Sequence, residues 1–545
     1  MRSDREMSPV FSLCDAYLTE WAALDPVSAG MRGLSASFGA ATDYSPEGYA
    51  ARAGLIGETL SELSALAVND DADRLAALLL RERLETQAAW HATGEPLREL
   101  RSPFGRIASL RDSVDLLPKD SEQAWRNIAA RLAAIPLMFG SWRASLDEGL
   151  RQGLPAARRQ ALGAAAQAER YAELRTHDAV LAAYGDGPLA GELADAAAAA
   201  YRGYLTVARY LREEYAPRAA EADAVGAERY AVNARLSLGA DLDAREAYEW
   251  GWAELARIEA ELAAEASRVK PGASVDEASE ILDETEFVEG EDAYQAWLQD
   301  RHDEAVARLD GVVFDIPAQL RVIEAVLARG SASGAAYYTA PSEDFTRPGR
   351  TWWPLGGRES FSTWNELTVV FHEGVPGHHL QAGAASLANL SRFARSTFIS
   401  GHGEGWALYA ERLADELGWF ESRRGSRLGM LAGSATRAAR VVIDIGVHLD
   451  LPLPDGSRWT FEKACEVLRD RGRAEGYRVV PEVTRYFGWP GQAPSYKLGE
   501  RAWLAAREAA SQRPGFDLKR WHTASLSLGP LGLESLTAEL ARLGG

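Results

Sequence analysis

The chain has 545 residues, 47% of them hydrophobic and 25% charged, which is the composition of a globular protein with one large core or several smaller ones. Lysine and arginine number 59 against 79 aspartates and glutamates, and the net charge of −20 argues against nonspecific binding to nucleic acid or to anionic membranes. No stretch contains 18 consecutive apolar residues, so we expect no transmembrane helix.

The first residues and the cysteine content indicate a cytoplasmic protein. Residues 1–6 include both acids and bases and lack the apolar segment of a signal peptide. Only two cysteines, Cys14 and Cys465, are present, whereas a secreted disulfide scaffold would contain more. We therefore expect two unpaired thiols in a reducing compartment.

Most of the chain is expected to form amphipathic helices. Alanine, leucine, arginine and glutamate are abundant and favour helix, and apolar residues recur at helical spacing. Ser45 followed by Pro46 predicts an N-cap and a first helical position. Similar periodic patterns fill residues 72–95, 121–150, 188–215 and 243–268.

The pattern changes between residues 310 and 356, where shorter apolar runs predict a small antiparallel sheet of about three strands. Segments 335–339 and 350–354 are typical of strands, whereas segment 320–326 is compatible with strand or helix. The edge of such a sheet can bind an extended peptide through backbone hydrogen bonds.

Helix is expected to return at Ser362, a candidate N-cap, and to continue through Val370 into the pair His372-Glu373. From about residue 384 onward the chain is again typical of helices, interrupted by a loop around residues 486–496.

The segment from His372 to His378 carries the strongest chemical signal. Two imidazoles and a distant carboxylate can hold a zinc ion with one position open for water, and Glu373 can take a proton from that water. The spacing of six positions from His372 to His378 would place their rings on different faces of a continuous helix. Pro376 and Gly377 therefore predict a kink or bulge that brings the rings together. His379 is the competing second ligand.

Glu404 lies 26 residues after His378 and is the candidate third ligand, in a helix expected over residues 404–413. Glu411 lies seven residues further along the same helical face. It is either a partner that orients a ligand or an ordinary ion-paired glutamate. His402 is either a residue of the cleft or a capping histidine.

The segments His372–Gln381 and Glu404–Glu411 resemble the signature of a bacterial family catalogued as domain of unknown function 885. Segments near the two ends of the chain, Trp21–Pro26, Ser45–Glu47 and Pro490–Gly499, extend this resemblance over nearly the whole sequence. The family is distantly similar to helical zinc peptidases of the thimet oligopeptidase, carboxypeptidase Taq and angiotensin-converting enzyme types. Their motif is His-Glu-x-Gly-His, from which this chain departs by a two-residue insertion.

The resemblance implies a mainly α, two-lobed body around a central cleft, with a small antiparallel sheet before the metal-binding helix. We expect a helical lobe over residues 1–310 and a catalytic lobe over residues 311–545, joined in one continuous unit. By the same resemblance, one zinc ion per chain is bound by His372, His378 and Glu404. Glu373 is then the general base, and Tyr496 stabilises the oxyanion.

These observations predict a zinc peptidase for short peptides, of the carboxypeptidase, dipeptidase or oligopeptidase type, acting as a monomer or homodimer without nucleic-acid or membrane partners. Two alternatives are a metal-dependent hydrolase acting on a non-peptide amide and a non-catalytic helical binding protein. The retained base Glu373 argues against the latter. The candidates for contact with substrate, including four cations for a substrate carboxylate, are Arg437, Arg440, Arg485, Lys497, His379, His402 and Tyr338.

Overall fold

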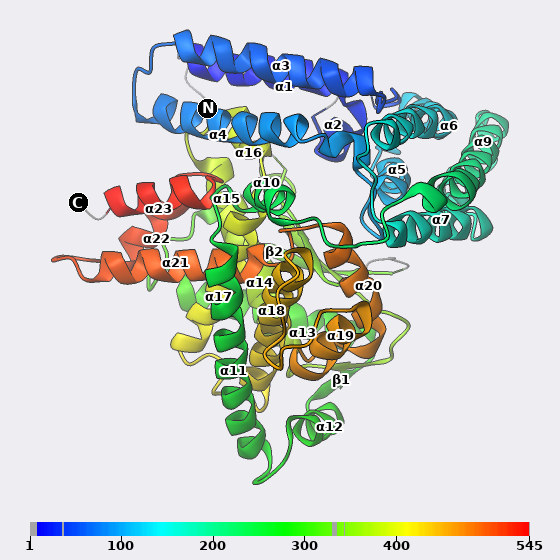
Figure 1. Cartoon of the computed structure of the whole chain (residues 1–545). Coiled ribbons are helices and arrows are strands. Elements are labelled where there is room, and N and C mark those ends of the chain that lie inside the picture. Colours follow the sequence, from blue (N-terminus) through cyan, green and yellow to red (C-terminus); the bar gives the residue numbers. More distant parts are fainter. Residues whose placement is uncertain (1–7, 35–37, 330–334, 343, 544–545) are drawn as a thin grey trace.

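The computed structural model describes residues 8–34, 38–329, 335–342 and 344–543, and it is mainly helical, as predicted (Figure 1). Residues 1–6, on which the expectation about a signal peptide depends, lie outside these ranges. None of the helices formed by the described residues is both long enough and apolar enough to cross a membrane.

Three N-terminal helices lie side by side along one side of the molecule, in blue in Figure 1. The second of them begins as predicted, with the Ser45 hydroxyl accepting a hydrogen bond from the backbone N–H of Gly48 at 3.2 Å. They are α1 (Pro9–Leu24), α3 (Pro46–Ala65) and α4 (Asp71–Ala92), with the short α2 (Pro26–Met31) after α1.

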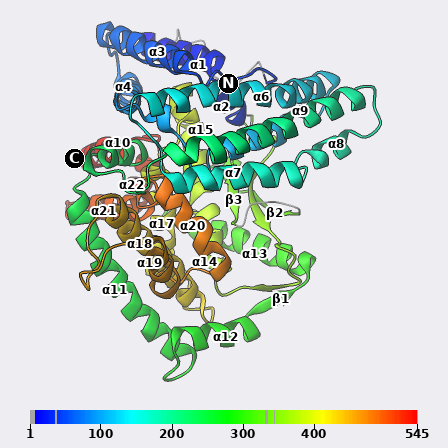
Figure 2. The same ribbon diagram turned by 45° about the vertical axis from the view of Figure 1, so that its right-hand side comes forward.

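A second group of helices has a hydrophobic core of its own, formed by residues between Val27 and Ala216. Figure 2 shows α9 between α6 and α7, and α9 packs against both. The periodic patterns at 121–150 and 188–215 correspond to α6 and to α9 with the π-helical turn Tyr210–Tyr215 that follows it. This group contains α5 (Arg106–Asp115), α6 (Glu122–Arg151), α7 (Arg158–Glu173), α8 (Asp178–Tyr184) and α9 (Ala190–Arg209).

The larger core combines residues from both sides of position 310, from Val10 to Leu540, so the predicted lobe boundary does not coincide with a division between hydrophobic cores. Besides α1, α3 and α4, it contains residues of α10 (Ala227–Leu238), α11 (Ala244–Val269), α12 (Val275–Thr285), α13 (Glu291–Leu309), α16 (Arg392–Ser396), α17 (Ser400–Glu416), α18 (Ser426–His448), α19 (Phe461–Glu466), α20 (Gly476–Gly488), α21 (Ser495–Ser511), α22 (Leu518–Leu526) and α23 (Leu533–Arg542).

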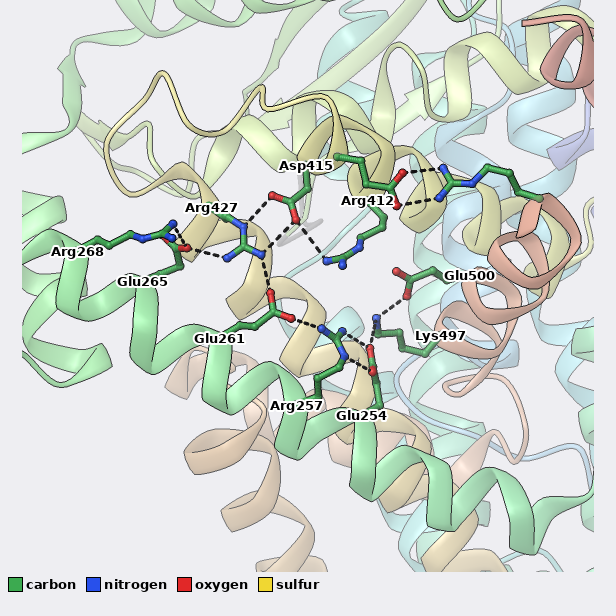
Figure 3. Close-up of polar contacts among 12 residues, drawn as sticks. Glu254, Arg257, Glu261, Glu265, Arg268, Arg412, Asp415, Arg427, Lys497 and Glu500 are labelled. Atoms are coloured by element: carbon green, nitrogen blue, oxygen red, sulfur yellow. Dashed lines mark hydrogen bonds and ion pairs between the residues drawn. The ribbon is translucent and has the colours of Figure 1, made fainter. Parts of the chain in front are cut away.

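Ion pairs join α11 to α18 and α21, and Arg427 of α18 extends them to α17 (Figure 3). Arg427 of α18 lies 2.6 Å from Glu261, 2.7 Å from Glu265 and 2.9 Å from Asp415 of α17. Lys497 of α21 lies 3.0 Å from Glu254 of α11. These pairs fix the helices that surround the site described below.

The sheet has three strands in the order β2 (Ile323–Ala328), β4 (Gly349–Pro354) and β3 (Tyr337–Thr339). The antiparallel pairing holds for β3 with β4, but β2 runs parallel to β4, so the sheet is mixed. The prediction of an all-antiparallel sheet fails because of strand order. β3 lies between β2 and β4 in the sequence but at the edge of the sheet, so β2 and β4 become neighbours and run parallel. Side chains of α13 cover the outer edge of β2, where Gln295 and Gln299 each donate to a backbone carbonyl at 2.8 Å.

The helix that carries the His-Glu pair, α14 (Glu366–Glu373), begins later than predicted. Ser362 does not cap it, because this residue belongs to strand β5 (Ser360–Ser362), which pairs antiparallel with β1 (Phe287–Glu289). The extended backbone of this pairing delays the helix start by one turn.

Glycines allow α17 and α21 to cross with their backbones in contact. A Cβ atom at Gly499 would overlap the carbonyl oxygen of Gly401, and one at Gly405 would lie 2.5 Å from the backbone of Gly499. At the same crossing, the hydroxyls of Ser400 and Ser495 lie 2.7 Å apart. The crossing brings the first turn of α21 next to the first turn of α17.

We expect Gly499→Ala to lower the free energy of unfolding by about 1–3 kcal/mol, because overpacking a close backbone contact forces the helices apart. The shift of the urea unfolding midpoint measures this effect. Gly57→Ala in α3 is the matched control, since no atom lies near its added Cβ, and it should be neutral or slightly stabilising. Equal midpoints for the two variants would contradict the proposed role of the crossing.

Candidate metal centre

The predicted break after Glu373 is present, and it divides the segment into two helices. α14 ends at Glu373, and α15 (His378–Leu387) begins after four intervening residues. Both intervening glycines are required by close approach. A Cβ at Gly374 would lie 2.5 Å from Nδ1 of His302, and a Cβ at Gly377 would overlap the carbonyl oxygen of His372.

The break brings His372 and His378 together with Glu404 of α17. One possible ligand atom of each residue lies within 4.8 Å of the other two. Among the described residues, these three side chains form the group that could hold a metal ion. Nε2 of His372 lies 3.4 Å from Oε2 of Glu404, and Nε2 of His378 lies 3.5 Å from the same oxygen. Two imidazole nitrogens and a carboxylate oxygen facing one point can hold a divalent metal ion.

Glu411 supports this group from behind. Its Oε1 lies 2.8 Å from Nδ1 of His372, and its other oxygen accepts a hydrogen bond from the hydroxyl of Thr368. A carboxylate on Nδ1 favours the tautomer in which the Nε2 lone pair faces a metal. Nη2 of Arg437 approaches Oε1 of Glu411 at 3.4 Å and partly neutralises this buried carboxylate.

The electrostatics of the group favour a positive charge. Burial lowers the pKa of His372, but hydrogen bonds to Glu404 and Glu411 raise it to about 10. Burial also opposes the ionisation of Glu404, whose pKa is nevertheless held well below its usual range by hydrogen bonds from His372 and His378. The positive charge that these carboxylates favour can be supplied by a proton on His372 or by a bound cation.

The side chain of Glu373 lies beside this group and has no hydrogen-bond or ion-pair partner among the described residues. Its side chain is only 7% exposed, yet it makes no hydrogen bond or ion pair with any other residue that the structure describes. Burial raises its pKa above the ordinary range, although the imidazoles of His372 and His378 oppose this rise. Glu373 lines the cavity described below, and a largely buried carboxylate with a raised pKa and no hydrogen-bond partner among the described residues indicates a function beyond packing.

Tyr496 also faces the group, from the first turn of α21 and not from the predicted loop, which ends at Pro494. Burial, followed by the nearby carboxylate of Glu404, raises the pKa of Tyr496 to about 12. Its phenol therefore stays protonated at neutral pH and can donate a hydrogen bond. The guanidinium of Arg440 lies over its ring, 4.8 Å from the centroid.

A cavity of about 1940 Å³ opens in front of His372, Glu373, His378, Glu404 and Tyr496. Helices α5 and α7 of the second helical group form its opposite wall, so it is the central cleft that was predicted. Several of the largest exposed apolar side chains of the protein line it: Met31, Phe104, Leu116, Tyr337, Phe398 and Tyr477.

Four of the predicted substrate contacts line this cavity, namely His402, Arg437, Arg440 and Tyr338. Nδ1 of His402 is occupied, because it lies 3.0 Å from the carbonyl oxygen of Leu531. The hydroxyl of Tyr338 lies 3.2 Å from Nδ1 of His379.

The other three predicted contacts are buried away from the cavity, so these predictions are wrong. His379 is fully buried, with Nε2 2.9 Å from the carbonyl oxygen of Leu320, so it is neither a ligand nor a residue of the cavity. Lys497 points to Glu254 and Glu500, as Figure 3 shows. Arg485 is held by Glu482 at 2.8 Å and by Gln492.

Sequence reasoning missed the residue that joins the two halves of the centre. The indole N–H of Trp406 donates to the carbonyl oxygen of Pro376 at 2.8 Å. It thereby ties the break between α14 and α15 to α17, two residues after Glu404. The position of this tryptophan inside the motif Glu404–Glu411 was the available signal.

The loop before Tyr496 is anchored by a buried carboxyl group on α18. Oδ1 of Asp444 accepts hydrogen bonds from the backbone N–H of Gly491 at 2.9 Å and from the hydroxyl of Tyr230 at 2.8 Å. Its Oδ2 has no hydrogen-bond partner among the described residues. Burial raises the pKa of Asp444 to about 7, despite these two hydrogen bonds.

The pKa of Asp444 predicts a pH dependence of stability. Because its folded pKa lies above the usual aspartate value, the folded chain binds more protons than the unfolded chain between about pH 4 and pH 7. As the pH rises from about 4 to about 7, the free energy of unfolding should therefore fall by up to about 1.4 kcal/mol per pH unit. Above this window, Asp444 should cause no further fall. Asp444→Asn keeps the acceptor and removes this loss. Urea midpoints of both proteins at pH 5 and pH 8 measure the difference, and parallel pH profiles would contradict the assignment.

Comparison with known proteins supports the fold and the family. The crystal structure of a protein described as a "putative lipoprotein" from Colwellia psychrerythraea matches with a TM-score of 0.84 and 22% identity, covering 99% of this chain and 100% of that chain. A "putative lipoprotein of unknown function" from Shewanella oneidensis matches with a TM-score of 0.78 and 16% identity, covering 98% and 100%. No curated protein matches. The family model described as "Bacterial protein of unknown function (DUF885)" matches residues 26–540, and the chain therefore belongs to the DUF885 family.

Proposed function

We propose that the protein is a zinc-dependent peptidase that hydrolyses short peptides and binds one zinc ion per chain. The observation that carries this proposal is the buried, unpaired carboxylate of Glu373 beside two imidazoles and a carboxylate that face one point. This donor set fits catalytic zinc, which takes three protein ligands and leaves one position open. The hydrogen bond between His372 and Glu411 adds the second carboxylate that such histidines commonly have.

When bound, zinc would lower the pKa of a water molecule to near 7 and polarise the scissile carbonyl group. Glu373 accepts the proton of the attacking water and delivers it to the leaving amine. Its raised pKa suits both steps, because a carboxylate with a raised pKa accepts a proton more readily before returning it. The phenol of Tyr496 donates a hydrogen bond to the developing oxyanion.

The cavity favours a peptide over a small non-peptide amide. Its volume of about 1940 Å³ exceeds the roughly 300–1,000 Å³ of typical small-molecule sites. Exposed apolar side chains line it, and the edge strand β3 contributes Tyr337 and Tyr338. The donor atoms lie in the wall of this cavity on side chains that are at most 16% exposed, which suits short peptides better than folded proteins.

We expect the purified protein to retain about one zinc ion per chain after incubation with zinc and dialysis. His378→Ala and Glu404→Ala should lose the metal, because each removes one of three ligands. His379→Ala is the matched control, since this adjacent ring faces Leu320 and should leave zinc binding intact. Elemental mass spectrometry measures the content. Loss of zinc in the control alone would assign the ligand to His379 and overturn this geometry.

Hydrolysis of a library of short peptides, followed by mass spectrometry, tests the activity. Glu373→Gln should retain zinc and lower kcat by roughly 10²–10⁴-fold, because the base is removed and the ligands stay. Tyr496→Phe should lower kcat by about 10²–10³-fold with a smaller effect on KM, because it removes one donor to the oxyanion. A zinc-loaded wild type that hydrolyses no peptide would refute the proposed function.

A further inference from the structure

Arg437 is the cation of the cavity that has the most hydrogen-bonding capacity left for a ligand. We propose that it binds the free C-terminal carboxylate of the substrate, so that the protein acts as a carboxypeptidase or dipeptidase on short peptides. This inference rests on the proposed peptidase function and names its substrate class. It is carried by the position of Arg437 and by the partners of the competing cations.

The position of Arg437 places it next to the reaction. Its Nη2 and Nδ1 of His372 contact the same oxygen of Glu411, at 3.4 and 2.8 Å. The guanidinium is therefore separated from a candidate metal ligand by a single carboxylate oxygen. A peptide residue spans at most about 3.6 Å, so a carboxylate bound here belongs to a residue close to the cleaved bond.

The other cations predicted to contact substrate already form ion pairs or hydrogen bonds within the protein. Arg440 donates to Glu482 at 2.9 Å and to the hydroxyl of Tyr486 at 3.1 Å. Arg485 and Lys497 are buried in ion pairs outside the cavity. Such pairs would have to break before these side chains could bind a substrate, which costs several kcal/mol when they are buried.

Arg437 makes no hydrogen bond to any described residue, and its side chain is 18% exposed. Among the described residues, Arg437 forms an ion pair with Glu411, at 3.4 Å. Its Nη1 lies over Gly433, one turn earlier in α18, where a Cβ atom would collide with it. A planar guanidinium with several free N–H groups matches the geometry of a carboxylate.

The charge of the site agrees with this assignment. Glu373, Glu404, Glu411 and Glu482 are opposed by Arg437 and Arg440, and a divalent ion would bring the formal charge of these groups from −2 to zero, so that they would not repel a substrate carboxylate. A chain with a net charge of −20 would otherwise repel an anionic group from its surface. The alternative role of Arg437 is structural, namely to neutralise Glu411. The two roles differ in one measurable quantity, the preference for a free carboxylate over an amide.

The experiment compares the tripeptide Ala-Leu-Phe with its C-terminal carboxamide. Dissociation constants are measured by calorimetry on zinc-loaded Glu373→Gln protein, which binds without cleaving, and kcat/KM is measured on the wild type. We expect the free acid to bind at least about tenfold more tightly, because a charge-assisted hydrogen bond contributes about 1.5–3 kcal/mol. Adding Arg437→Gln should bring the acid-to-amide ratio to near one.

Two further variants make the ratio interpretable. Arg437→Lys keeps the charge beside Glu411 but loses the bidentate geometry, so it should show an intermediate ratio even if Arg437→Gln lowers zinc content. Arg469→Gln removes another arginine that lines the cavity, one paired with Asp470 at 2.7 Å, and should leave the ratio unchanged. A purely structural role of Arg437 would change zinc content without changing the ratio.

The results separate this inference from the proposed function. Equal binding and equal cleavage of the acid and the amide by the wild type would overturn the role of Arg437 and leave the peptidase function standing. An unchanged acid preference in both Arg437 variants would also overturn it. Failure of the zinc-loaded wild type to cleave any library peptide would remove the proposed function and this inference with it.

Discussion

The candidate centre depends on one steric constraint, the close approach of the backbone at Gly377 to the carbonyl oxygen of His372. A residue with a side chain could not occupy this position without a backbone shift, and a continuous helix would carry the two histidines to different faces. The break instead ends α14 at Glu373 and starts α15 at His378. The hydrogen bond from Trp406 to the carbonyl of Pro376 then fixes the break against α17. Three helices meet at one point because one backbone contact permits it and one indole N–H holds it.

Four acidic side chains lie in the protein interior near this point or on α18, and they differ in the partners that stabilise their carboxyl groups. Glu404 is stabilised by two imidazoles, and Glu411 by a histidine, a threonine and Arg437. Asp444 instead keeps a raised pKa and anchors a loop. Glu373 alone has no partner among the described residues. Because an unpaired buried carboxylate is costly, the partner of Glu373 is best sought in what enters the cavity.

The sequence was sufficient where structure follows from local chemistry. Helical periodicity predicted α4, α6, α9 and α11 to within a few residues, because an amphipathic stripe is visible in a single segment. Pro376 and Gly377 predicted the break for the same reason. The parallel pairing of β2 with β4 could not be predicted from the sequence, because it depends on the order of the strands in the sheet. His379, Lys497 and Arg485 were misassigned since their partners lie 59, 243 and 3 residues away, and even the nearest was not visible as a buried pair.

A polar stripe on α18 connects the parts of the site that the sequence left separate. Arg437, Arg440, Asp444 and His448 follow one another at intervals of three or four residues, so they share one face of the helix. Arg437 contacts Glu411 beside the candidate metal ligands, Arg440 covers the ring of Tyr496, and Asp444 holds the loop that leads into Tyr496. His448 continues the stripe to the carbonyl oxygen of Tyr486 in α20. Helix α18 thus carries Arg437 and also holds Tyr496 of α21 in place. In the proposed mechanism, the spacing between Arg437 and Tyr496 would limit how far from its carboxylate a bound peptide is cut.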